Sequence, residues 1–315
     1  MTHRRLGRGL SDFAAPFDPG AASGRPAGSS STARAIREVT RTTRRAGRES
    51  TPRPFVLCVT SGKGGTGKSV LTSNLAVHLA ASGVGVMAVD VDMGLANLHL
   101  LLGMRPRRTI AEVIERGASL DDVAEIGPVG MRLAAGGSGI PEMADLNAHR
   151  LRRLVAAMDQ VNERTEAVLV DTGAGIGRAT TSFLQTLGEI LVVTTPDLTA
   201  MTDAYAVIKN VAHNNRTAQI SLVVNRASSP VEALEIYGRM EKICRKFLDR
   251  SILYLGHVLD DPRVPASVAA RIPILLNQPG APAAACIRAI GRSILLNVRR
   301  HASLQSRRDL GVGEA

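Results

Sequence analysis

A nine-residue segment with four glycines and two lysines has the residue types that surround polyphosphates. It follows a short apolar run at 55–60 and precedes a helical pattern, which is the context of the G-x-x-x-x-G-K-[ST] motif. Glycines let backbone N–H groups approach phosphate oxygens, and the helix N-terminus adds positive potential. We expect Lys68 to meet the β- and γ-phosphates and the Ser69 hydroxyl to ligate Mg²⁺. The expected nucleotide-binding residues here are Gly62, Lys63, Gly64, Gly65, Thr66, Gly67, Lys68 and Ser69.

Carboxylates follow two further apolar runs. Asp90 and Asp92 lie at the end of the run 84–90, where they can point toward a phosphate crevice. Asp171 ends the run 167–171, and the small residues after it form a loop able to move with a γ-phosphate. Asp171 is therefore expected to hold the Mg²⁺ shell. On spacing alone, solvated loop acids or a strand-end helix cap remain alternatives.

The surrounding pattern alternates between strands and helices from Phe55 onward. The expected strands are 55–60, 84–90, 131–134, 167–171, 190–195, 220–225 and 252–259. The expected helices are 68–82, 109–116, 147–163, 178–187, 201–213, 230–248 and 281–300. Strands that are apolar on both faces and interleaved with helices predict an α/β fold with a mainly parallel twisted sheet covered on both sides.

Charge is distributed unevenly along the 315 residues. The net charge of +11 comes from residues 1–54, at +7, and residues 288–315, at +4, while the middle is neutral. A basic isoelectric point therefore does not by itself indicate a nucleic-acid-binding protein. Residues 14–34 are rich in Ala, Pro, Gly and Ser, so we expect a disordered basic tail over 1–54, a folded domain over 55–301 and a flexible tail over 302–315.

Several classes of protein are disfavoured by composition. Aromatic residues make up only 3% of the chain, which argues against a base-stacking platform. The three cysteines are far apart, which argues against a disulfide framework and against a metal-cluster carrier. No apolar run approaches the length of a membrane span, and the start lacks the apolar core of a secretory signal, so we expect a cytoplasmic protein.

The second lysine makes the glycine-rich loop more specific. The form K-G-G-x-G-K-S resembles the deviant Walker A motif of the MinD/ParA-type ATPases. The resemblance implies a P-loop fold, ATP and Mg²⁺ as cofactors, and a homodimer in which Lys63 reaches the partner's nucleotide. It also implies that Asp90 supports Mg²⁺, that Asp92 orients the attacking water, and that Asn225 and Asp261 lie at the adenine. From the residues alone, a solvated loop residue remains an alternative for Lys63, and an Asn at the end of a strand, such as Asn225, is more often a turn former.

The amino-acid sequences of four longer segments indicate one branch of that family. The segments 90–103, 171–175, 194–209 and 255–275 are similar to the flagellar MinD-like ATPases, the FlhG, FleN and YlxH group. This resemblance implies a switch ATPase that controls flagellar number, placement or assembly and hydrolyses ATP slowly, under stimulation by a partner. The partner would be an FlhF-type GTPase, a switch-complex protein or a flagellar transcription regulator. The alternative is a ParA-like ATPase that positions DNA or other cargo.

Two features of that branch are not recognisable. The glutamine-containing activation motif of many members is absent from 1–54, and no separate amphipathic membrane-targeting helix is obvious at the C-terminus. In the last predicted helix, Ile287, Ile290 and Ile294 share a face while arginines occupy another. An ordinary packed helix explains this pattern, and a peripheral membrane contact aided by the basic flank is the second hypothesis.

Overall fold

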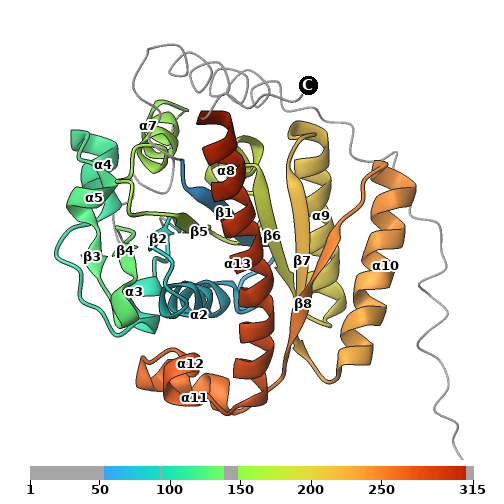
Figure 1. Ribbon diagram of the computed structural model, residues 1–315. Helices are drawn as coiled ribbons and strands as arrows, with labels where there is room; N and C mark the ends of the chain where they lie inside the picture. Colours follow the sequence, from blue (N-terminus) through green and yellow to red (C-terminus); the bar gives the residue numbers. More distant parts are fainter. Residues whose placement is uncertain (1–52, 93, 138–147, 310–315) are drawn as a thin grey trace, which may run out of the picture.

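The structure, a computed structural model, describes residues 53–92, 94–137 and 148–309. The strands are β1 (Phe55–Ser61), β2 (Val86–Asp90), β3 (Glu125–Ile126), β4 (Arg132–Ala134), β5 (Ala167–Asp171), β6 (Glu189–Thr194), β7 (Gln219–Ala227) and β8 (Leu253–Leu259). They form one sheet in the order β3-β4-β2-β5-β1-β6-β7-β8 (Figure 1). Only the β3–β4 pair is antiparallel among these strands. The prediction of a mainly parallel sheet is confirmed.

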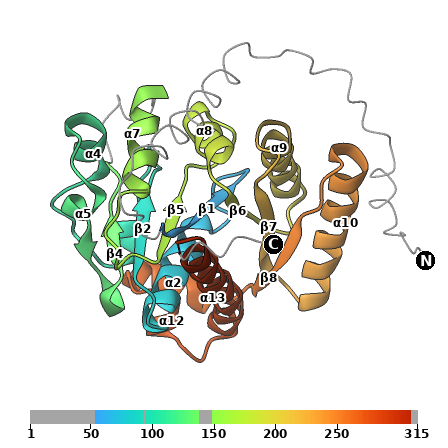
Figure 2. The same cartoon turned by 45° about the horizontal axis from the view of Figure 1, so that its top comes forward.

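Helices cover both faces of this sheet. They are α2 (Lys68–Ala81), α3 (Leu98–Leu101), α4 (Ile110–Arg116), α5 (Leu120–Val123), α7 (Ala148–Met158), α8 (Arg178–Thr186), α9 (Leu198–Asn214), α10 (Pro230–Leu248), α11 (Arg263–Ala270), α12 (Ile274–Asn277) and α13 (Pro282–Asp309). Figures 1 and 2 show α2 and α13 on one face and α7, α8, α9 and α10 on the other. Side chains alternate along β1, so Leu57 and Val59 join the core under α2 and α13, whereas Cys58 joins the core on the opposite face.

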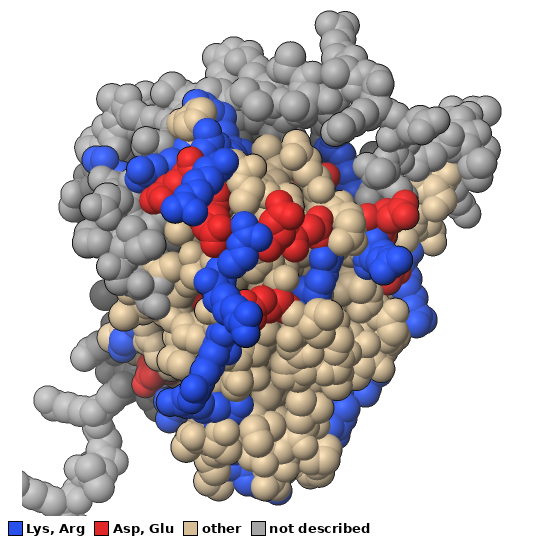
Figure 3. Space-filling model, turned by 90° about the vertical axis from the view of Figure 1, so that its left-hand side faces the viewer, with Lys and Arg blue, Asp and Glu red and all other residues tan. Residues whose placement is uncertain are grey.

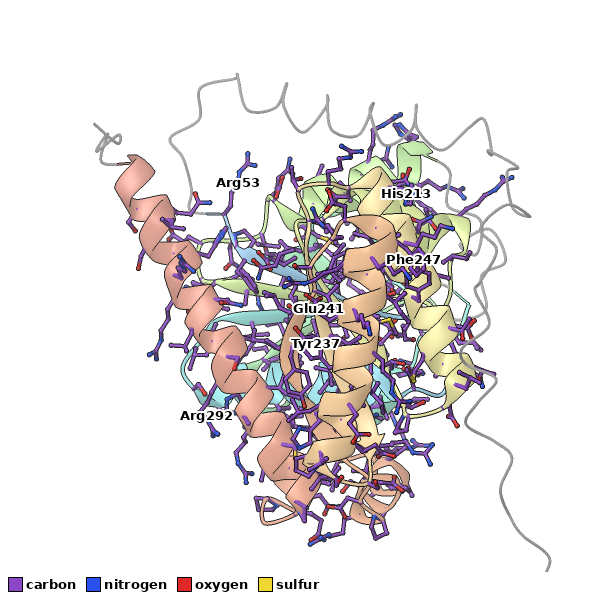
Figure 4. All side chains as sticks on the ribbon, turned by 90° about the vertical axis from the view of Figure 1, so that its right-hand side faces the viewer. Arg53, His213, Tyr237, Glu241, Phe247 and Arg292 are labelled. Carbon is purple, nitrogen blue, oxygen red and sulfur yellow. The ribbon has the colours of Figure 1, made fainter. Side chains whose placement is uncertain are left out.

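The edge strand β8 is fastened to α10 by polar contacts. The Tyr237 hydroxyl donates to the Ile252 carbonyl at 3.1 Å, and Glu241 accepts from the Ile252 amide at 2.8 Å (Figure 4). The rings of Tyr237 and Tyr254 lie 5.0 Å apart. These contacts hold the beginning of β8, whose other end delivers Asp261 to the carboxyl edge of the sheet.

The last helix, α13, is longer than the sequence predicts. Its apolar side chains Ile287, Ile290 and Ile294 are buried against the sheet and α2, which confirms the packed-helix interpretation of this face. The helix continues to Asp309 instead of ending near residue 300. The ring of His301 lies edge-on to the Phe55 ring, with 5.9 Å between the ring centroids, so packing against β1 extends the helix beyond its apolar repeat. None of the helices in the described ranges has the length and apolar content required to span a bilayer.

Other boundaries also differ from the sequence prediction. Helix α7 ends at Met158 because the following residues form a turn in which Asn162 donates to Asp121 through its backbone and side chain. The four-residue helices α3, α5 and α12 were not predicted, since they are too short to show a helical period. Helix α11 was not predicted either, and its sequence has a proline at its third position. Nearly all of the predicted tail 1–54, and residues 310–315, lie outside the described residues.

Candidate nucleotide-binding site

The glycine-rich loop connects β1 to α2 at the carboxyl edge of the sheet. Gly67 precedes α2 with a left-handed φ of 87°, and a Cβ there would lie 2.2 Å from Nδ2 of Asn225. A Cβ on Gly62 would lie 2.1 Å from the backbone of Asp203 in α9. The loop therefore requires glycine for its conformation at one position and for close packing at the other.

Asp171, at the end of β5, is the centre of a buried polar cluster. Its Oδ2 atom accepts from Lys68 Nζ at 2.9 Å and from Ser69 Oγ at 2.6 Å. Its Oδ1 atom accepts from Thr72 Oγ1 at 2.8 Å. Asp171 is fully buried, and Lys68 is only 6% exposed. The structure thus brings together three residues that the sequence singled out, together with Thr72, which it did not.

Asp90 lies next to Asp171 on the neighbouring strand β2, where the two residues are in register. Its carboxylate accepts from the backbone N–H groups of Asp92, Asn97 and Leu98 at 3.1, 2.9 and 3.0 Å. Burial, followed by the charge of Asp171, raises the pKa of Asp90 to about 7. Two neighbouring buried carboxylates require a compensating cation, which at present is the ammonium of Lys68 alone among the described side chains within hydrogen-bond distance.

These groups have the chemistry of a magnesium and phosphate site. Carboxylate and hydroxyl oxygens are the ligands that Mg²⁺ prefers, and Ser69, Asp90 and Asp171 supply them. The buried hydroxyl of Thr66, within the loop, has no hydrogen-bond partner among the described residues. An orphaned donor in a glycine-rich loop fits a ligand with acceptor oxygens. The residues present therefore fit both a magnesium ion and the phosphates of a nucleotide.

Asp92 lies between the loop that follows β2 and the loop that follows β5. Its Oδ1 accepts from the Leu95 amide at 3.2 Å, and the same atom would lie 3.5 Å from a Cβ on Gly173. The side chain is half-buried, in contrast to the fully buried Asp90. Asp92 is thus placed near the site and retains contact with solvent, a position that suits a group facing water.

Lys63 lies apart from the buried cluster. It is exposed, and its Nζ donates to Thr199 Oγ1 at 3.0 Å, at the first turn of α9. The two lysines of the loop therefore face different surroundings. Sequence reasoning identified both lysines and missed Thr199, because only the tertiary packing of α9 against the loop brings it near.

A pocket of about 300 Å³ opens beside Gly67, between β7 and α11. Asn225 and Asp261 both line it, as the resemblance implied for a base site. Asn225 Nδ2 donates to the Thr66 carbonyl at 2.7 Å, so this amide also holds the glycine-rich loop. The carboxylate of Asp261 accepts from the Arg263 side chain at 2.8 Å and from the Ala283 amide at 3.2 Å. These contacts fix α11 and the beginning of α13, while a contact of Asp261 with a base stays a prediction.

The chain matches the family described as the CobQ/CobB/MinD/ParA nucleotide binding domain over residues 57–274. The chain belongs to this family. Its glycine-rich loop and all three of its motif aspartates lie within the matched range.

Two similar proteins carry flagellar names. The antiactivator FleN of Pseudomonas aeruginosa is 35% identical over 76% of this chain and 85% of its own length. The flagellum site-determining protein YlxH of Helicobacter pylori is 34% identical over 64% of this chain and 68% of its own. The resemblance to the flagellar branch of the MinD-like proteins is therefore confirmed.

Solved structures agree with the fold. The cell division ATPase MinD of Pyrococcus furiosus superimposes with a TM-score of 0.63, at 26% identity over 76% of this chain and 98% of that one. The septum site-determining protein MinD of Pyrococcus horikoshii, solved in complex with Mg-ADP, superimposes with a TM-score of 0.64 at 23% identity. These likenesses confirm the MinD-like fold.

Proposed function

We propose that this chain is an ATP-dependent, dimerising switch that regulates flagellar number, placement or assembly and resets itself by hydrolysing ATP to ADP and phosphate. The observation that carries the proposal is the separation of the two loop lysines, one buried on Asp171 and one exposed on Thr199. A nucleotide-binding protein that works alone needs only the first. The similarity to FleN and YlxH supports the flagellar role.

In the proposed mechanism, the loop binds the phosphates of ATP through the backbone N–H groups of residues 62–69, and Lys68 exchanges Asp171 for the β- and γ-phosphates. Ser69, Asp90 and Asp171 would hold Mg²⁺, which would neutralise charge on the phosphates. Asp92 orients the water for in-line attack. Hydrolysis is slow because completing the site requires a partner that orders the loops around Asp92.

Asn225 gives the site its preference for adenine. Its Nδ2 is committed to the Thr66 carbonyl, so its Oδ1 is the atom available to a base in the adjoining pocket. An acceptor oxygen matches the amino group of adenine and opposes the carbonyl of guanine at the same position. Asp261 completes the far side of this pocket.

Exposed apolar residues surround the rim of the site and support dimerisation. Leu95 is 76% exposed, Ile176 56% and Leu198 51%. Leu95 lies on the loop that carries Asp92, Ile176 lies on the loop that follows Asp171, and Leu198 begins α9, next to the Thr199 that contacts Lys63. Large apolar side chains clustered around a functional rim are characteristic of an interface. In the ATP-bound dimer, Lys63 reaches the nucleotide of the other subunit.

The surface supports a protein partner over nucleic acid. Figure 3 shows acidic side chains among basic ones in the upper part of the face that carries α4, α5 and α7, beside a band of basic side chains that runs down this face. Ion pairs join Arg108 to Glu112 and Arg132 to Asp121 on this face. Acidic side chains beside the basic ones repel a phosphate backbone and reduce the number of phosphates that the face can neutralise. We therefore favour an FlhF-type GTPase, a switch-complex protein or a flagellar transcription regulator as the partner, over the ParA-like alternative of DNA positioning.

A peripheral membrane contact at the inner face of the cell membrane is a further part of this proposal. The apolar face of α13 is buried, so it is not available to lipid. Arg292 lies on the outer side of the helix, where Leu296 is 67% exposed (Figure 4). Sedimentation with anionic liposomes, with and without ATP, tests this contact through Leu296→Ser with Arg299→Ser. Equal pelleting of the variant and the unaltered protein would remove α13 from the membrane hypothesis.

The central test is molecular mass by light scattering with ADP and with ATP. We expect a dimer with ATP and a monomer with ADP. The Asp92→Ala variant should remain a dimer after ATP binds, and the Lys63→Ala variant should not form the dimer. A monomer under every condition would overturn the dimeric switch. ATP-dependent binding to nonspecific DNA, steeply weakened by salt, would favour the DNA-positioning alternative instead.

A further inference from the structure

Three side chains donate to the Asp171 carboxylate, and they divide between its two oxygens. Lys68 and Ser69 both contact Oδ2, whereas Thr72 contacts Oδ1 at 2.8 Å. Thr72 lies one turn after Ser69 on α2 and is fully buried. Both oxygens of the carboxylate thus accept hydrogen bonds from protein side chains before any ligand binds.

These donors differ in what else they can do. In the mechanism proposed above, Lys68 turns to the phosphates and Ser69 to the metal. Thr72 has no such second task, since its other contact is with the Lys68 carbonyl within the same helix, at 3.0 Å. A hydroxyl has one proton, and a carboxylate is the stronger acceptor of the two. Because threonine is β-branched, its χ1 angle is restricted and the hydroxyl stays in place.

Asp171 needs such a fixed donor because of its surroundings. It is fully buried and in register with Asp90, and the negative charges of the two carboxylates repel each other. Once Lys68 has turned to the phosphates and Ser69 to the metal, Thr72 is the side chain among the described residues that still donates to Asp171. Outer groups of this kind orient a ligating carboxylate and thereby set metal affinity.

We propose that Thr72 is a positioning residue that fixes the Asp171 carboxylate through its Oδ1, so that Oδ2 faces the divalent cation, and that it thereby sets the affinity of the site for Mg²⁺. This inference rests on the proposed function, because it takes Asp171 as part of the magnesium site. It assigns a role to a residue that lies outside the G-x-x-x-x-G-K-[ST] motif.

The experiment titrates Mg²⁺ into the full chain with a fluorescent ADP analogue and compares the midpoint with nucleotide binding in EDTA. Thr72→Val removes the hydroxyl at nearly constant volume, and Thr72→Ser restores it. Ser73→Ala is the matched control, because the neighbouring buried hydroxyl donates to the Val70 carbonyl and not to Asp171. Thermal unfolding of each variant shows that it is folded.

We expect Thr72→Val to raise the Mg²⁺ midpoint about ten-fold, with binding in EDTA unchanged, and Thr72→Ser and Ser73→Ala to stay near the unaltered protein. A midpoint in Thr72→Val equal to that in Ser73→Ala overturns the proposal. So does an equal loss with and without Mg²⁺, which would mean that the hydroxyl supports the whole loop. Failure of the unaltered protein to bind nucleotide would instead overturn the proposed function.

Discussion

The buried floor and the exposed rim of the candidate site are built from the same loop in opposite ways. Lys68 is 6% exposed and lies 2.9 Å from Asp171, inside a cluster that also holds Ser69 and Thr72. Lys63, five residues earlier, is exposed, and among the described residues its ammonium donates only to the Thr199 hydroxyl. One lysine is fixed by the core, and the other is fixed by a single surface contact.

The difference indicates how such a site divides its work. The floor is determined by sheet register, because Asp90 and Asp171 end adjacent parallel strands. The rim ends in exposed loops with Leu95, Ile176 and Leu198 on its surface. The floor is complete within one chain, whereas the rim leaves an exposed apolar surface, which under the proposed function contacts a second molecule. Variants of each region should therefore fail in different assays.

The largest effect is expected at the floor. Lys68→Ala should lower nucleotide affinity at least about 100-fold, because it removes a charge-assisted phosphate contact and leaves two buried carboxylates without their ammonium. Lys63→Ala is the matched control and should change the affinity of the monomer for ADP less than about three-fold. Titration with a fluorescent ADP analogue measures both. Similar losses in the two variants would mean that the floor and the rim do not differ in the monomer.

The second prediction concerns pH. The pKa of Asp90 is raised to about 7 in the fold, chiefly by burial, so without metal its ionisation is harder in the folded state than in the unfolded chain. Its contribution to stability is therefore lost as pH rises toward and through 7. In EDTA, Asp90→Asn should gain about 2 kcal/mol of unfolding free energy relative to the unaltered protein between pH 5 and pH 8.

Urea unfolding at several pH values measures this difference. Asp92→Asn is the control, because its side chain is half-buried at the rim. A difference between Asp90→Asn and the unaltered protein that is constant across this pH range would contradict the prediction.

The third prediction addresses the apolar surface of the rim. Leu198→Ser should leave the free energy of unfolding within about 0.5 kcal/mol, because the side chain is exposed. It should weaken the ATP-dependent dimer about ten-fold, since burial of one leucine is worth about 1.5 kcal/mol. Leu304→Ser on α13 is a matched control, because both leucines are 51% exposed. Analytical ultracentrifugation in ATP measures the dimer, and equal dissociation constants for both variants would remove Leu198 from the interface.

The smallest effect is expected at Thr199. Thr199→Ala removes an exposed hydrogen bond to Lys63, which should cost less than about 0.5 kcal/mol of stability and leave ADP binding unchanged. Thr202→Ala, on the next turn of α9, provides the comparison. A loss of ADP affinity in Thr199→Ala would show that the rim lysine already takes part in nucleotide binding within one subunit.

Much of this arrangement was predictable from local pattern. The apolar runs at 55–60, 167–171 and 220–225 predicted three strands that the structure contains, and the motif fixed which lysine begins α2. The short helices α3 and α12 and the extension of α13 were not predictable, because they depend on contacts with distant residues and not on a repeating period. His301 joins the fold through the Phe55 ring, which no local pattern reveals.

The sequence by itself determined the loop, the strand ends and the identity of the carboxylates, because glycine spacing and apolar runs act locally. Only the tertiary structure decided that Asp171 is held by Thr72 as well as by Lys68, and that Lys63 faces Thr199. It also decided that Asn225 supports the loop through Thr66. The physical reason is that parallel strands place their carboxyl ends at one edge of the sheet, which brings together groups such as Asn225 and Thr66 that lie 159 residues apart in the chain.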